Sequence, residues 1–174
     1  LSPNKDVDCA TDSMLLATLS GRSFALAPCT AEAVIAILDH YGIEIAGARV
    51  AVVGRSNVIG RPVAALLTMR DATVTLCHSR TVDLPSVTRE AEILVVAAGR
   101  ARMVGSGYVA PGQTVIDVGI NWDETSQKLV GDVDAEAIKD IVAAYTPVPG
   151  GVGSVTTAIL AKHVIEAAER TLVS

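Results

Sequence analysis

The fold is decided by residues 50 to 62, which read Val-Ala-Val-Val-Gly-Arg-Ser-Asn-Val-Ile-Gly-Arg-Pro. The first four residues form an unbroken apolar run, as expected of a strand that is buried on both faces. Gly54 ends this strand, Gly60 follows six residues later, and Pro62 suits the first turn of a helix. A strand, a glycine turn and a helix form the phosphate cradle of a dinucleotide fold, because backbone N–H groups and the helix dipole both face the anion.

The glycine spacing has an alternative interpretation. The pattern is Gly-x-x-x-x-x-Gly rather than the usual Gly-x-Gly-x-x-Gly. A tight turn between a strand and a helix in any α/β domain would also produce it. The remainder of the chain therefore has to distinguish the two.

The composition favours an α/β core. Half of the 174 residues are hydrophobic but only 3% are aromatic, so the core must consist of Ala, Val, Leu and Ile, which suit helices packed closely on a parallel sheet. The net charge of −5 is unfavourable for binding nucleic acids or acidic membrane surfaces. No apolar run approaches the roughly 20 residues of a spanning helix. We therefore expect no nucleic-acid partner and no membrane span.

The cysteines and histidines favour a cytoplasmic protein without a metal site. Cys9, Cys29 and Cys77 form no Cys-x-x-Cys pair, which is typical of reduced thiols in the cytosol. The polar N-terminus carries no secretory signal. The three histidines are scattered along the chain, so no metal centre is expected.

Strand-like and helix-like segments alternate along the chain. Thr30 is predicted to cap a helix over 31–41, and Gly42 to end it as residue C′. We expect further helices at 12–19, 63–69, 83–91, 134–142 and 155–171, strands at 49–53, 73–77, 93–97 and 115–118, and a Pro/Gly-rich loop at 145–153. This alternation predicts an α/β fold, a Rossmann-like doubly wound parallel sheet with flanking helices.

The segments that follow the predicted strands indicate where a ligand would bind, because ligands of such sheets lie beyond the carboxyl ends of the strands. These segments are 54–60, 78–81, 99–102 and 119–122. All are glycine-rich, polar or charged, which is consistent with one shared ligand crevice.

The residues after the strand at 73–77 indicate which dinucleotide would bind. An NAD site usually has Asp or Glu there to accept hydrogen bonds from the ribose 2′-hydroxyl. Here His78, Ser79 and Arg80 follow without an acid, and Arg55 in the glycine turn adds a second cation. Two guanidinium groups and a hydroxyl suit a 2′-phosphate, so NADP is favoured over NAD. The alternative is that Arg80 is only a solvated surface residue.

A dehydrogenase also needs groups that bind substrate and handle a proton, and candidates are few. Asp117 lies on an apolar strand, where a buried carboxylate needs partners, although it would equally serve as a hydrogen-bonded strand-end residue. Asp6 and Asp8 lie outside the alternating unit and would either reach a ligand or cap a turn.

Three other polar side chains have ordinary alternatives. His78 is better interpreted as a packing or phosphate neighbour than as a base, and His163 as a core or interface histidine. Tyr145 would equally be a core residue with its hydroxyl at the surface. The residues alone thus indicate a cofactor-binding half without a nucleophile–base pair.

Five strings, in the right order, resemble the methylenetetrahydrofolate dehydrogenase/cyclohydrolase family. They include Val-Gly-Arg-Ser-Asn-Val-Ile-Gly-Arg-Pro at 53–62 and Thr-Pro-Val-Pro-Gly-Gly-Val-Gly at 146–153, with others at 73–81, 115–121 and 130–133. The resemblance runs from Lys5 to about Glu169. It implies an NADP-dependent enzyme of one-carbon metabolism that oxidises 5,10-methylenetetrahydrofolate by hydride transfer and hydrolyses the methenyl product to 10-formyltetrahydrofolate. It also implies a homodimer joined through this domain, with a tetrahydrofolate derivative as substrate.

The resemblance assigns roles to particular positions. The first glycine loop would line the cofactor phosphates, Ser79 would hold the 2′-phosphate, and the backbone of Ile120 would meet the nicotinamide. Asp8 would contact the pterin ring of the folate. The implied cofactor-binding residues are Gly54, Arg55, Ser56, Ile59, Gly60, Ser79, Arg80, Ile120, Gly153 and Thr156. The implied substrate-binding residues are Asp8, Pro149, Gly150, Gly151 and Val152.

The catalytic lysine of the family belongs to a Tyr-x-x-x-Lys motif in a separate N-terminal domain, which this sequence does not contain. No catalytic residue is therefore assigned. We expect residues 1–30 to be a remnant of, or link to, that folate/catalytic domain, and residues 31–174 to be the NADP-binding Rossmann domain.

Several residues depart from the family pattern. Cys9 stands where the family has Gly, Ala31 and Ala33 replace Pro and Gly, and Ser154 and Val155 replace Pro and Met. All lie on the folate side or at the domain junction, whereas the cofactor strings are intact. An alternative is therefore a catalytically inactive NADP(H)-binding module that diverged from the family. A third hypothesis is a dehydrogenase for a different substrate.

Overall fold

The computed structural model describes residues 2–21 and 26–172. Its helices are η1 (Pro3–Lys5), α1 (Asp12–Leu19), α2 (Cys29–His40), α3 (Gly60–Met69), α4 (Leu84–Arg89), η2 (Ser106–Tyr108), α5 (Ala135–Ile138) and α6 (Val152–Leu172). Its strands are β1 (Arg49–Val53), β2 (Thr73–Cys77), β3 (Ile93–Val96), β4 (Thr114–Asp117), β5 (Asn121–Asp123), β6 (Lys128–Val130) and β7 (Ala144–Tyr145).

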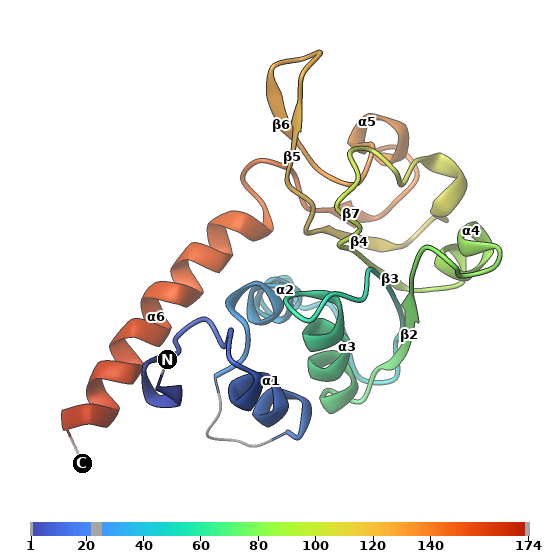
Figure 1. The fold of residues 1–174 in the computed structure, drawn as a ribbon. Coiled ribbons are helices and arrows are strands. Elements are labelled where there is room, and N and C mark those ends of the chain that lie inside the picture. Colours follow the sequence, from blue (N-terminus) through green and yellow to red (C-terminus); the bar gives the residue numbers. More distant parts are fainter. Residues whose placement is uncertain (1, 22–25, 173–174) are drawn as a thin grey trace.

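In these described ranges, five strands form one sheet in the order β2-β1-β3-β4-β7, and every neighbouring pair is parallel (Figure 1). The chain runs from β1 outward to β2 and then returns to the other side of β1 for β3. This reversal is the defining feature of a doubly wound sheet. The predicted α/β fold, a Rossmann-like doubly wound parallel sheet with flanking helices, is confirmed.

Both faces of the three central strands, β1, β3 and β4, are buried, and alternate residues of β1 serve different cores. Val50 and Val52 face α2 and α3, whereas Ala51 and Val53 face the core that contains Ile138 of α5. The long helix α6 packs along α2 and then extends beyond the sheet to the N-terminal segment (Figure 1). No described helix is long and apolar enough to cross a lipid bilayer.

Most predicted elements are confirmed. The helix at 12–19 and the strands at 49–53 and 73–77 have the expected bounds. Gly42 follows α2 with φ +64°. The Gly42 N–H donates to Asp39 O at 3.1 Å and the Ile43 N–H to Leu38 O at 2.9 Å, which is the bonding pattern of a Schellman cap.

Some boundaries were wrong. Pro28 rather than Thr30 occupies the N-cap of α2, and the helix expected at 134–142 is limited to Ala135–Ile138. The helix ends early because residues 144 and 145 pair with β4 as strand β7. Tyr145 therefore belongs to this strand and not to the predicted loop. The terminal helix begins at Val152, three residues before the predicted start. The polar β5–β6 hairpin was not predicted, because strands of three residues carry too little alternation.

Candidate cofactor and substrate site

The strand order reverses between β1 and β3, whose carboxyl ends lie side by side, and this is the point at which doubly wound sheets bind ligands. Gly54 ends β1 there with φ +126°, a conformation that side chains of L-residues rarely adopt. A Cβ atom at Gly54 would overlap the carbonyl oxygen of Ala97, and one at Gly60 would overlap the carbonyl of Gly54. The loop is therefore folded so tightly against the sheet that both positions require glycine. The loop from Gly54 to Gly60 fits a dinucleotide, because its close packing on the sheet leaves backbone N–H groups and the start of α3 accessible to a diphosphate.

The loop from Gly54 to Gly60 is held by its own side chains. The hydroxyl of Ser56 accepts a hydrogen bond from the Ile59 N–H at 3.1 Å, and Arg61 donates to Asn57 Oδ1 at 2.8 Å. Arg55 is exposed and has no carboxylate partner among the described residues. The guanidinium of Arg55 is thus available to an anionic ligand.

The loop after β2 is a compact turn organised by His78. The His78 N–H donates to Thr81 Oγ1 at 2.9 Å, and its Nδ1 accepts from the Arg80 N–H at 3.1 Å. Because Nδ1 is an acceptor here, His78 folds the loop, in agreement with its interpretation as a packing neighbour. The side chains of Ser79 and Arg80 are left exposed at the end of the strand.

Two buried aspartates connect the loops that follow β3 and β4, and sequence reasoning gave no role to the second. Asp117 accepts hydrogen bonds from the backbone N–H groups of residues 119, 132 and 133 at 2.9–3.0 Å. Asp132 accepts from the N–H groups of residues 98, 99 and 100 at 2.6–2.8 Å and from Asn121 Nδ2 at 2.9 Å. The two carboxylates therefore fix both loops at the carboxyl edge of the sheet.

Two glycines make room for these carboxylates. A Cβ atom at Gly119 would overlap Asp132, and one at Gly131 would overlap Asp117. Burial raises the pKa of Asp117 above its usual range, although the three N–H donors act in the opposite direction. Asp117 is thus a hydrogen-bonded strand-end residue, which was one of the two interpretations of the sequence.

A cavity of about 240 Å³ lies between the end of β4 and the start of α6. Predicted site residues from two distant segments line it together, namely Ile120, Pro149, Gly150, Gly151, Val152 and Gly153. Thr156 does not line this cavity, and its hydroxyl donates to Val152 O within α6 at 3.0 Å. The cavity adjoins Asp117, so the loop that begins α6 and the loop after β4 meet beside the carboxylate pair.

Asp8 lies apart from this cavity, at the first turn of α2. Its Oδ1 accepts a hydrogen bond from the Cys29 N–H at 3.4 Å. Cys9 follows with φ +53°, a left-handed conformation, which explains why glycine suits this position. The thiol of Cys9 donates to Leu26 O at 2.8 Å. Asp6 accepts from Ala10 and Thr11 and forms the turn that was one alternative for it.

No three His, Cys, Asp or Glu side chains in the described ranges gather as a metal site would require.

The family profile of "Tetrahydrofolate dehydrogenase/cyclohydrolase, NAD(P)-binding domain" matches residues 28–172. The chain belongs to this family. The family resemblance of the sequence is thereby confirmed, as is a cofactor of the NAD(P) type.

Individual members of the tetrahydrofolate dehydrogenase/cyclohydrolase family agree with the profile. The bifunctional protein FolD of Clostridioides difficile is 50% identical over 167 residues, which are 96% of this chain and 58% of that protein. The structure of the bifunctional enzyme from Campylobacter jejuni superimposes with a TM-score of 0.92 at 40% identity, covering 96% of this chain and 59% of the other. The Trypanosoma brucei enzyme, complexed with NADP cofactor and inhibitor, also gives 0.92 at 38% identity, covering all of this chain and 61% of that one.

The chain spans less than two thirds of the length of these relatives. The matched part contains the sheet, the glycine loop and the carboxylate pair. These comparisons therefore concern the cofactor-binding half of the longer proteins.

Proposed function

We propose that this chain is the NADP-binding half of a methylenetetrahydrofolate dehydrogenase/cyclohydrolase. The observation that carries the proposal is the cradle at the β1–β3 crevice, which only glycine at positions 54 and 60 permits, on a chain of this family. The full activity oxidises 5,10-methylenetetrahydrofolate and hydrolyses the methenyl product. A catalytic lysine from an N-terminal half completes it.

NADP would lie across the carboxyl edge of the sheet. The loop at 54–60 would bind the diphosphate. Arg55, Ser79 and Arg80 would bind the 2′-phosphate, because the loop at 78–81 contains no acidic residue that would repel it. The nicotinamide, which accepts the hydride, would lie near Ile120 and the cavity at 149–153. The NADP complex of the Trypanosoma brucei relative supports this cofactor.

The folate would meet the nicotinamide at the Pro/Gly-rich loop. Pro149, Gly150, Gly151 and Val152 line the cavity beside Ile120, and loops without Cβ atoms allow two flat rings to approach. Asp8 would contact the pterin ring.

Residues 1–30 are the link to the folate/catalytic half and residues 31–174 the cofactor domain, a division supported by a family match that begins at residue 28. Three free thiols support a cytoplasmic location.

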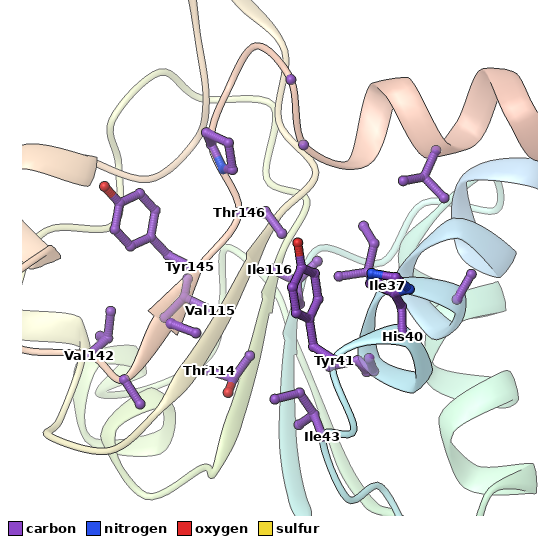
Figure 2. A pocket seen from close by; sticks show the side chains of 18 of the residues that line it. Ile37, His40, Tyr41, Ile43, Thr114, Val115, Ile116, Val142, Tyr145 and Thr146 are labelled. Carbon is purple, nitrogen blue, oxygen red and sulfur yellow. The ribbon is translucent and has the colours of Figure 1, made fainter.

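A homodimer forms through this domain in the proposal, and an uncovered apolar groove supports it. The groove, of about 790 Å³, lies between the end of α2 and strands β4 and β7 (Figure 2). Ile37, Tyr41, Ile43 and Ile116 line it, and Tyr41 is 73% exposed. A second copy would bury this apolar surface. Light scattering should then give twice the 17.9 kDa monomer mass, and Tyr41→Asp should reduce the mass to that of a monomer, whereas Val82→Asp, at another exposed apolar position, should not.

Cofactor titrations test the proposed function. Arg55→Ala and Ser79→Ala should each weaken NADP⁺ binding roughly tenfold or more, because each removes a charged or hydrogen-bonded contact to the 2′-phosphate. NAD⁺ affinity should change less than about twofold. Arg49→Ala, at the opposite end of β1, is the matched control and should affect neither. Equal losses for both cofactors would refute the assignment of the 2′-phosphate site.

The second candidate is an inactive NADP(H)-binding module, favoured by the departures at Cys9, Ala31, Ala33, Ser154 and Val155. A mixing assay distinguishes the two. This chain would be combined with the lysine-bearing half of a relative, and NADPH formation from 5,10-methylenetetrahydrofolate would be followed. Turnover supports the enzyme, whereas NADP⁺ binding without turnover supports the inactive module.

A further inference from the structure

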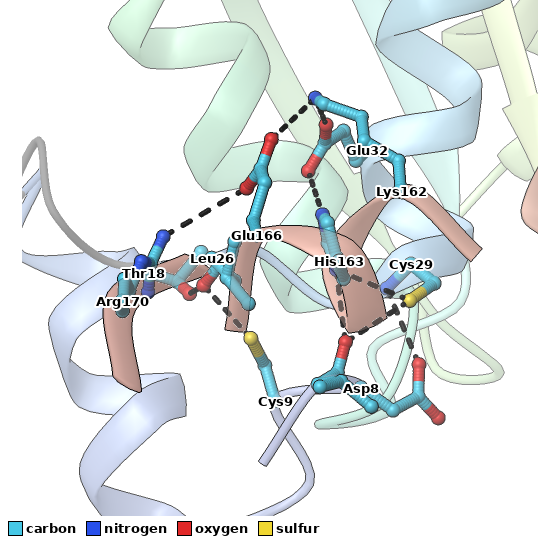
Figure 3. A network of polar contacts seen from close by, with 11 residues as sticks. Asp8, Cys9, Thr18, Leu26, Cys29, Glu32, Lys162, His163, Glu166 and Arg170 are labelled. Carbon is cyan, nitrogen blue, oxygen red and sulfur yellow. Dashed lines mark hydrogen bonds and ion pairs between the residues drawn. The ribbon is translucent and has the colours of Figure 1, made fainter. Parts of the chain in front are cut away.

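His163 is a completely buried polar side chain that the proposed function does not use. It lies in the middle of α6, about 16 Å along the helix axis from Val152 at the cofactor cavity. Figure 3 shows that its ring points between α2 and the N-terminal segment that carries Asp8. A buried imidazole must have partners for its nitrogens, and their identity determines its role.

The first nitrogen of the ring binds the peptide that precedes Asp8. His163 Nδ1 lies 2.8 Å from the carbonyl oxygen of Val7. A carbonyl only accepts, so Nδ1 must carry a proton and donate. The thiol of Cys29 lies 3.4 Å from both atoms, and burial raises the pKa of that thiol to about 12. Cys29 is therefore neutral and adds a second, weaker donor to the same carbonyl.

The second nitrogen binds a carboxylate. His163 Nε2 lies 2.8 Å from Glu32 Oε2, and the other oxygen of Glu32 accepts from Lys162 Nζ at 2.9 Å. A carboxylate that is paired with an ammonium group is ionised and only accepts. The ring is thus held between two acceptors, the Val7 carbonyl at Nδ1 and the Glu32 carboxylate at Nε2.

The charges around this ring form a chain along α6. Glu166 lies 3.7 Å from Lys162, and Arg170 lies 3.8 Å from Glu166. On the N-terminal side lie Asp8 and the buried thiol of Cys9, which Figure 3 draws together with the ring. Glu32, the carboxylate that contacts the ring, is therefore the first member of a series of alternating charges along α6.

These contacts hold the peptide between two buried, hydrogen-bonded residues, Asp6 and Cys9. Val7 is half-buried and Asp8 is exposed, so packing alone does not define their backbone. Asp8 reaches the Cys29 N–H only if the peptide is held against α2. We infer that His163 and Glu32 are positioning residues, which hold the Val7 carbonyl and thereby orient the Asp8 carboxylate. The orientation follows from the structure, while its use for folate rests on the proposed function.

Two substitutions at position 163 separate the two bonds of the ring. The amide nitrogen of Asn lies close to the place of Nδ1, and that of the longer Gln close to the place of Nε2. His163→Asn therefore keeps the donor to Val7, whereas His163→Gln keeps only the donor to Glu32. If His163 had only a general structural role, both substitutions would impair the protein to the same extent.

Nuclear magnetic resonance of the full chain provides the first measurement. In the unmodified protein, ¹⁵N-labelled His163 should show a proton on Nδ1, the nitrogen that faces the Val7 carbonyl. The Cys29 amide, which binds Asp8, should exchange with solvent roughly tenfold faster in His163→Gln and near the original rate in His163→Asn. An Nδ1 atom without a proton in the unmodified protein, or equal acceleration in both variants, would overturn the inference.

Titration with 5,10-methylenetetrahydrofolate provides the second measurement. His163→Gln should weaken folate binding roughly tenfold while NADP⁺ affinity is unchanged, and His163→Asn should restore folate binding to within about twofold. Equal weakening in the two variants would contradict the inference. If the unmodified chain binds NADP⁺ but no folate, the folate part of the proposed function fails. The amide exchange still decides whether His163 orients Asp8.

Discussion

The cofactor side of the molecule and the proposed folate side, which carries Asp8, are built in different ways. The cofactor side consists of loops shaped by glycines and by backbone N–H groups that bind Asp117 and Asp132. The folate side consists of side chains from α2, α6 and the N-terminal segment, and the bond from His163 to Val7 joins residues 156 positions apart. The first therefore tolerates almost no change in shape, whereas the second depends on particular side-chain pairs.

The largest effect is expected from Gly54→Ala. A Cβ atom there overlaps the carbonyl of Ala97 and also requires an unfavourable φ of +126°. We expect a loss of stability of about 3 kcal/mol or more and NADP⁺ binding weakened by more than roughly a hundredfold. Urea unfolding and cofactor titration measure the two effects. Gly105→Ala is the control, since nothing lies within 4 Å of an added Cβ atom there, and an equally small effect at Gly54 would disprove the tight cradle.

Asp132→Asn should have the next largest effect. The carboxylate faces four N–H donors, so an amide would turn its own donor toward one of them. We expect a loss of about 2–4 kcal/mol in stability and weaker NADP⁺ binding, because the loops after β3 and β4 lose their common anchor. Asp140→Asn, at an exposed position after α5, should change stability by less than about 1 kcal/mol in the same unfolding experiment.

The sequence predicted the fold around the first glycine loop because the signals there are local. The strand, the glycine pair and the absence of an acid after β2 lie within short segments, and each has a direct physical consequence. Asp132 was missed because its role depends on loops more than 30 residues away, which no periodicity reveals. Glu32 was missed for the same reason, because its partner His163 lies 131 residues further along the chain. Tyr145 was misassigned because a strand of two residues is defined by its neighbour and not by its own sequence.

The two sides should respond in opposite directions to acid. Burial of Asp6 on the folate side tends to raise its pKa, but the hydrogen bonds from Thr11 and Ala10 outweigh burial and hold the pKa below its usual value. The stability that Asp6 contributes is therefore present above about pH 4 and is lost as the pH falls through the lowered pKa. Asp117 has a raised pKa, so its contribution is largest below about pH 4 and declines as the pH rises through that raised value.

Unfolding free energies measured from pH 3 to pH 7 test this contrast. Relative to the unmodified protein, Asp6→Asn should flatten the rise of stability with pH, because the variant cannot gain the Asp6 contribution. Asp117→Asn should make the rise steeper, since it removes a group that opposes it. Changes of the same sign in both variants would show that the two carboxylates do not differ in environment as the contacts indicate.

The smallest effect concerns Cys9, where a side chain occupies a position that suits glycine. Cys9→Ala keeps the left-handed conformation at φ +53° and loses the thiol bond to Leu26, so it should be destabilising. Cys9→Gly loses the same bond but relieves the backbone, so it should be more stable than the alanine variant by about 1 kcal/mol. Ala10 is the control, because its φ is not positive and glycine there should be destabilising. If glycine were the worse choice at both positions, side-chain packing and not backbone conformation would govern the folate-side turn.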